Sequence, residues 1–169
     1  PGTEQCPMTF SFNNVILVAE KKLYYYNPTD GFRQITDGGN VGNPIDVIFV
    51  ANFIVLTDGS RIYHSQILNE ESFPLENEAV AEFEPDATLA LEKNEDNELV
   101  VFGQFSTEHF IFNAAPTGFA FQPLDRKASK LGVSGVKSMD ELESVWYTVG
   151  RREESAPSCY AYMGGTGKR

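Results

Sequence analysis

Short apolar runs recur along the chain, and most are followed, after a polar turn, by a second run rich in aromatic or β-branched residues. Short runs of this composition between turn residues are typical of β-strands. Residues 27–31 and Asp58-Gly59 supply turn chemistry, because Asn, Asp and Pro favour tight turns and Gly accepts a positive φ. The predicted strands cover residues 15–18, 23–26, 47–50, 53–56, 99–102, 109–112, 145–149 and 159–162.

Helical patterns are weak throughout the chain. Pro74 and Pro85 interrupt the stretch from 70 to 86, and Pro breaks a helix because it lacks an N–H donor and clashes with the preceding turn. Only residues 138–143 have a composition that predicts a single helical turn. We therefore predict an all-β fold.

The predicted hairpins repeat at a regular interval. Four units begin near Asn14, Asn52, Asn97 and Leu142, about 38, 45 and 45 residues apart. This interval is the period of one four-stranded β-propeller blade. The sequence predicts a β-propeller-like fold with about four blade-like units, or an arc of a larger propeller, in a single β domain over residues 1–169. A β-sandwich, which also has many short strands, is the structural alternative.

Charge narrows the set of partners. The 169 residues include 24 acidic and 13 basic side chains, for a net charge of −11. Most of the acidic excess lies between Glu70 and Glu98. A surface of this sign repels phosphate, so we expect no tight binding of nucleic acid. The apolar runs are too short to cross a membrane, and no membrane partner is expected.

The ends of the chain carry two further observations. Cys6 and Cys159 are the two cysteines, and we interpret them as free thiols in a reducing cytoplasm. The chain begins with Pro1 rather than Met, which we interpret as a piece of a longer protein.

Few residues offer catalytic chemistry. His64 lies near Asp58 and Ser60, which are the residue types of a nucleophilic triad, but the latter two are better explained as a hairpin turn. His109 lies in a predicted aromatic strand, and we interpret it as a strand residue rather than a base or ligand. No motif predicts a metal site or cofactor. We therefore expect a protein that is not an enzyme and has no cofactor.

A glycan-binding or glycan-cleaving propeller module is the alternative function. A glycosidase needs two carboxyl groups in a cleft, one of them in an apolar setting that raises its pKa. Glu82 and Glu84 flank Phe83 and would share one face of a strand, a signal too weak to name an enzyme. The side chains that could stack on sugars, although their strand spacing favours a core role, are Tyr24, Tyr25, Tyr26, Trp146 and Tyr147.

Two groups of opposite charge are candidates for a protein interface. The basic group follows the 121–124 segment, and the acidic group lies in the stretch after Glu70. If copies of the protein form a ring, such groups could attract one another head to tail. The candidate interface residues are Arg126, Lys127, Lys130, Glu76, Glu78 and Glu82.

The stretch from 97 to 138 resembles a known family. The segments that carry the resemblance are Leu99–Gly103, Ser106–Phe110, Gly118, Gln122-Pro123, Arg126 and Gly132–Gly135. In this order they are similar to the tail accessory proteins of short-tailed bacteriophages, also called packaged-DNA stabilisation or tail-hub proteins. The hairpin at 145–162 continues the pattern, and residues 52–73 resemble it more weakly.

This resemblance implies a structural virion protein with a β-propeller-like body. It implies a ring below the portal that closes the exit channel, retains packaged DNA and scaffolds tail attachment. The implied partners are portal or adaptor ring proteins and other tail proteins, with a homo-oligomeric ring in the full-length protein. The implied location is the virion tail, with synthesis in the cytoplasm of the bacterial host.

Overall fold

The computed structural model describes residues 5–114, 118–136, 138–143, 145–163 and 166–168. In this part of the chain the strands form four antiparallel sheets, each built from consecutive strands. Blade 1 has the order β1 (Met8–Ser11), β2 (Asn14–Ala19), β3 (Lys22–Asn27) and β4 (Gly31–Ile35). Blade 2 has the order β5 (Asp46–Val50), β6 (Phe53–Thr57), β7 (Ile62–His64) and β8 (Glu78–Ala79).

The other two sheets follow the same plan. Blade 3 has β9 (Thr88–Lys93), β10 (Leu99–Gly103), β11 (Thr107–Phe112) and β12 (Phe121–Pro123). Blade 4 has β13 (Gly132–Val133), β14 (Met139–Leu142), β15 (Val145–Arg151), β16 (Ser158–Met163) and β17 (Thr166–Lys168). Short 3-10 turns occur at η1 (Asp37–Gly39) and η2 (Asp125–Lys127).

The helical turn predicted for residues 138–143 is wrong. Residues 139–142 form strand β14, which pairs with β15 in the register Met139↔Thr148 to Leu142↔Val145. A helical turn of this length has almost no stability of its own, because one turn fixes several residues for a single hydrogen bond. Pairing with β15 therefore decides the conformation. Both β13 and β14 pair with β15, so the first strand of blade 4 is split in two.

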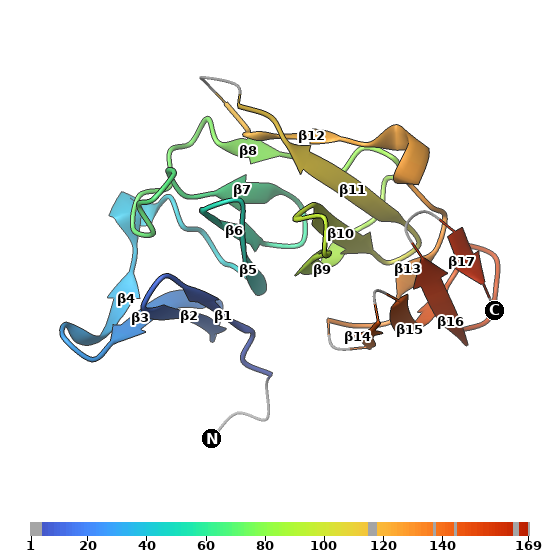
Figure 1. Cartoon of the computed structure of the whole chain (residues 1–169), viewed down its shortest axis with the longest axis horizontal. Helices are drawn as coiled ribbons and strands as arrows, with labels where there is room; N and C mark the ends of the chain where they lie inside the picture. The colour runs from blue at the N-terminus through green and yellow to red at the C-terminus, as the bar shows by residue number, and fades with distance from the viewer. Residues whose placement is uncertain (1–4, 115–117, 137, 144, 164–165, 169) are drawn as a thin grey trace.

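The four sheets follow one another around an open arc (Figure 1). The first strands lie on its inner side, where β1 contacts β5, β5 contacts β9 and β13 contacts β10. Each predicted hairpin is the middle pair of one sheet, namely β2–β3, β6–β7, β10–β11 and β15–β16. The β-propeller-like prediction is confirmed. The sandwich alternative is wrong, because the strands belong to four consecutive sheets rather than two stacked ones.

Three apolar clusters hold neighbouring blades together. Leu23 of blade 1 and Leu56 of blade 2 share the first cluster, and Val55 and Val101 share the second. Phe102 packs in the third cluster against Trp146, with ring centroids 5.8 Å apart. Burial of these side chains is the main source of stability at each junction, because apolar burial contributes about 25 cal/mol per Å².

The end blades differ from the middle blades in the burial of their second strands. All residues of β6 and β10 are buried, whereas β2 and β15 alternate between buried and more exposed positions. Phe10 is 71% exposed on the outer face of blade 1, and Tyr147 is 51% exposed on the outer face of blade 4. Each end blade therefore packs one face on its neighbour and leaves an apolar face in solvent.

Candidate functional site

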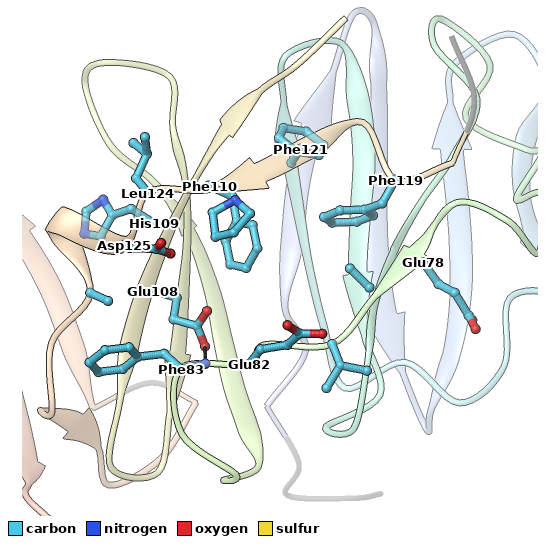
Figure 2. A pocket seen from close by; sticks show the side chains of 14 residues that line it. Glu78, Glu82, Phe83, Glu108, His109, Phe110, Phe119, Phe121, Leu124 and Asp125 are labelled. Atoms are coloured by element: carbon cyan, nitrogen blue, oxygen red, sulfur yellow. Dashed lines mark hydrogen bonds between the residues drawn. The ribbon is translucent and has the colours of Figure 1, made fainter. Parts of the chain in front are cut away.

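A groove of about 580 Å³ lies between blades 2 and 3, at the outer ends of both sheets (Figure 2). Its walls come from β8 and the segment after it, and from β11, β12 and the residues at and around η2. The volume falls within the range of about 300–1,000 Å³ that is typical of small-ligand sites. The side chains with chemical function in its lining are Glu78, Glu82, Glu108, His109, Phe110, Phe119, Phe121 and Asp125.

One side of the groove is aromatic and the other is acidic. The rings of Phe119 and Phe121 lie across from the carboxyl groups of Glu82 and Glu108 (Figure 2). Phe119 and Phe121 contact each other with centroids 5.6 Å apart. Glu78 already forms an ion pair with Arg61, which draws its charge toward the rim. The groove therefore combines apolar surface with negative charge.

Glu108 is the most perturbed carboxyl group of the groove. Glu108 is the second residue of β11 and is buried, with 4% of the residue exposed. Burial raises the pKa of Glu108, and the nearby carboxylates of Asp86 and Glu82 raise it further. The Phe83 N–H donates to Glu108 Oε1 at 3.1 Å and opposes this rise only in part. A positive charge placed beside Glu108 would favour its ionised form and so oppose the rise in its pKa.

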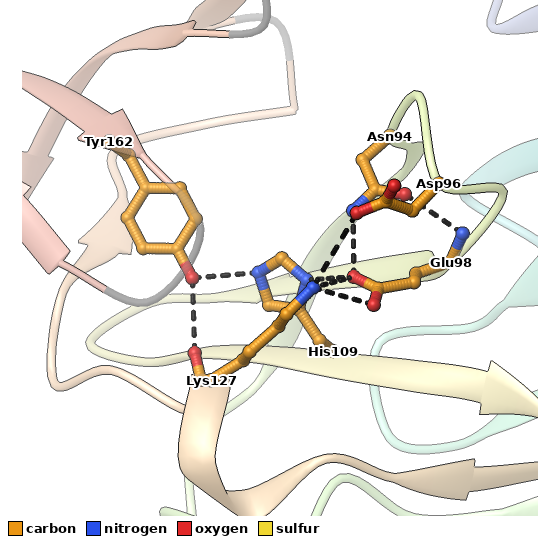
Figure 3. A network of polar contacts seen from close by, with 6 residues as sticks. All are labelled: Asn94, Asp96, Glu98, His109, Lys127 and Tyr162. Carbon is orange, nitrogen blue, oxygen red and sulfur yellow. Dashed lines mark hydrogen bonds and ion pairs between the residues drawn. The ribbon is translucent and has the colours of Figure 1, made fainter.

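Blades 3 and 4 are joined by a buried polar network (Figure 3). His109 Nδ1 lies 3.1 Å from Glu98 Oε2, and His109 Nε2 lies 2.7 Å from the Tyr162 hydroxyl of blade 4. Lys127 Nζ donates to both Glu98 oxygens at 2.6 and 2.8 Å. Burial raises the pKa of Glu98, but hydrogen bonds from Lys127, His109 and Asn94 outweigh it and hold the pKa below its usual value. The network orients blade 4 on blade 3.

A second buried histidine joins blades 2 and 3. His64 Nδ1 lies 2.6 Å from the Ser65 carbonyl oxygen, and His64 Nε2 accepts the Ala120 N–H at 2.9 Å. These partners require a neutral ring with its proton on Nδ1, because a carbonyl accepts and an amide N–H donates. Burial lowers the pKa of His64, as it does the pKa of His109. Both histidines are structural connectors between blades.

We predict that acid destabilises the protein below pH 6.5. The unfolded histidines take up protons there, whereas His64 and His109 in the folded state resist protonation because their pKa values are lowered. Each contributes a slope of up to about 1.4 kcal/mol per pH unit between 6.5 and its folded pKa. Urea unfolding from pH 7.5 to 5.5 measures this loss. His64→Gln keeps an acceptor for the Ala120 N–H but does not titrate, so the stability of this variant should fall less steeply with decreasing pH. An equally steep fall would contradict the role of His64 in the acid sensitivity.

The predicted interface residues are divided by the fold. Lys127 pairs with Glu98 in the network, and Lys130 forms an ion pair with Glu84. Arg126 is exposed beside them. Two of the three basic residues thus have acidic partners within the same chain.

The predicted acidic interface residues lie near the groove. Glu78 and Glu82 line it, and Glu76 is exposed just before β8. The basic group therefore follows blade 3 and the acidic group belongs to blade 2, and the acidic partners of Lys127 and Lys130 are Glu98 and Glu84, which were not predicted for the interface.

The sequence missed the groove and the network. Glu108, Glu98 and Tyr162 were not singled out, although the polar run Thr107–His109 inside an apolar strand was a usable signal for buried hydrogen bonds.

Glu82 and Glu84 do not share a strand face, because residues 80–87 form no strand in the structure. Within the described residues, no cluster of three or more His, Cys, Asp or Glu side chains is arranged to hold a metal ion.

The predicted sugar-stacking residues have mixed positions. Tyr25 and Trp146 are buried between blades, as the core interpretation expects. Tyr26 and Tyr147 are exposed, but they lie on the outer faces of the two end blades rather than in the groove.

The described part of the chain also contains no helix long and apolar enough to cross a membrane.

Meander sheets that pack face to face around an arc, with polar connectors at their junctions, define a β-propeller protein. The family described as "Bacteriophage P22 Gp10, beta-propeller" matches residues 1–169. The chain belongs to this family of phage DNA-stabilising tail proteins, which confirms the resemblance found in the sequence.

The curated proteins include no significant match. Among solved structures, the chain is similar to Hsv2 of Kluyvelomyces marxianus, with a TM-score of 0.43 and 10% identity. The match covers 92% of this chain and 48% of that one, so the chain spans about half the length of that solved structure.

Proposed function

We propose that this chain belongs to a tail component that closes the portal channel after packaging, retains the DNA and scaffolds the attachment of other tail proteins. The observation that carries this proposal is the family match over the whole chain. The net charge of −11 supports it, because a protein at the exit of a DNA channel functions best when it does not bind DNA tightly. The partners would be portal or adaptor proteins, and the location the virion tail.

We propose further that residues 1–169 form an arc of a larger propeller, made in the host cytoplasm and assembled as a ring of identical copies. The exposed apolar faces of blades 1 and 4 support the first part, because a propeller normally covers every blade face with a neighbour. The charged groups around Arg126 and Glu76 are candidates for contacts between copies. Lys127 and Lys130 would contribute less, since both have partners within the chain.

The experiment that tests the function uses DNA-filled phage heads lacking this component. Purified full-length protein should bind them and slow DNA loss to the level of complete particles, and a propeller of similar charge from another family should not. Reversing the charge of Arg126 alone should weaken assembly of the ring, because Lys127 and Lys130 have ion-pair partners within the chain whose loss would disturb the fold itself. Binding without retention would contradict the sealing role, and unchanged assembly would remove the interface assignment.

A glycan-binding module remains a second candidate because of one observation. Glu82 and Glu108 enter one apolar-walled groove, and the pKa of Glu108 is raised by burial. The lining is less suited to sugars than this pair suggests, since sugars need hydrogen-bond donors as well as acceptors.

A further inference from the structure

The groove between blades 2 and 3 has the chemistry of a receptor for cations. Its polar side chains are carboxylates, which only accept hydrogen bonds when ionised, and His109, whose two ring nitrogens are engaged by Glu98 and Tyr162. No lysine or arginine occurs among the described lining residues. A ligand must therefore bring donors and positive charge.

The apolar wall determines which cations suit the groove. A guanidinium or ammonium group can approach Glu82 and Glu108 while its methylene stem covers Phe119 and Phe121. Aromatic rings also attract such cations directly. Glu78 is engaged by Arg61, and one oxygen of Glu108 accepts the Phe83 N–H. Glu82 and Asp125, both exposed, are therefore the carboxylates most available to a ligand, and Glu108 adds negative charge from the wall of the groove.

The sheet edge distinguishes a protein segment from a free amine. Among the described strands, β8 pairs with β7 alone, and its residues Glu78 and Ala79 line the groove. An extended peptide can add to such an edge through backbone hydrogen bonds and place alternate side chains in an adjoining pocket. A polyamine has no backbone to use this edge.

We propose that the groove binds an extended segment of another protein in which arginine or lysine alternates with apolar residues. The cationic side chains enter beside Glu82 and Glu108, and the backbone lies along β8. The inference does not depend on the portal-sealing role.

The test uses the purified protein and a fluorescein-labelled peptide in which arginine alternates with valine. Fluorescence anisotropy measures its affinity at two salt concentrations. The double variant Glu82→Gln with Glu108→Gln should weaken binding by about tenfold or more, since two charge-assisted contacts are lost. The matched control, Glu20→Gln with Glu95→Gln, removes the same charge from exposed turns outside the groove and should change affinity less than about twofold.

Further arms separate the alternatives. If Glu108→Gln prevents folding, the exposed pair Glu82→Gln with Asp125→Asn should still weaken binding more than the control pair. Equal losses in groove and control variants would show general attraction to an acidic protein and overturn the proposal. Three other results would also overturn the proposal. A peptide with glutamine in place of arginine could bind equally well, or spermidine could compete as strongly as the peptide does. A glycan could also occupy the groove when the peptide does not.

Discussion

Replacing Gly132 with alanine is expected to remove about 3 kcal/mol or more of folding stability. A methyl group at this position would overlap the backbone of Gln104 and Phe105, which form the β10–β11 turn of blade 3. Backbone cannot move aside as a flexible side chain can, so blade 4 would have to shift away from blade 3. Gly150, which faces the Gly132 carbonyl across the β13–β15 pair, is subject to the same constraint.

Gly135→Ala is the matched control for this substitution. Gly135 lies in the bend that follows β13, and an added methyl group meets nothing within 4 Å. Its stability should change by about 0.5 kcal/mol or less. Thermal unfolding measures both variants, and the Gly132 variant should melt about 6–12 °C lower for a chain of this size. Similar melting temperatures for the two variants would show that the junction between blades 3 and 4 is not closely packed in solution.

The strands that could be predicted from the sequence are those with a local signal. Leu99–Phe102 and Val145–Val149 are apolar or aromatic runs next to turn residues, and both are strands in the structure. Strands β8 and β13 have two residues each and no pattern of their own. They exist because a neighbouring strand offers them hydrogen bonds, which is information held in the tertiary fold.

The candidate site was less predictable, because it depends on contacts between distant residues. His109 and Tyr162 are 53 positions apart, and Lys127 and Glu98 are 29 apart. Lys127 was predicted as a protein-interface residue from its basic neighbours, whereas its ammonium group lies against a buried carboxylate of the same chain. Charge in a sequence shows which groups can pair, but the blade arrangement decides which ones do.

Introducing a charge on the outer face of an end blade should cost little stability where that face is exposed to solvent and much more where a further blade covers it. Phe10 and Tyr147 are exposed in this chain, so Phe10→Glu with Tyr147→Glu should cost less than about 1 kcal/mol of stability and reduce self-association. If further blades cover these faces in the full-length protein, the same substitutions bury two unpaired carboxylates. The cost there should be on the order of 3 kcal/mol or more, with loss of assembly into tails.

Leu75→Glu supplies the comparison, because Leu75 is also largely exposed but lies in the loop between β7 and β8 rather than on an end face. It should be tolerated both in the 169-residue chain and in any longer protein whose further blades cover the end faces. Sedimentation velocity measures self-association of the chain, and urea unfolding measures the stability of both forms. Equal tolerance of the end-face and loop variants in the full-length protein would mean that blades 1 and 4 keep their outer faces in solvent. Greater sensitivity of the end-face variants in the longer protein than in the 169-residue chain would instead show that these faces are blade junctions, because the strand positions are the same in both and only the burial of the faces differs.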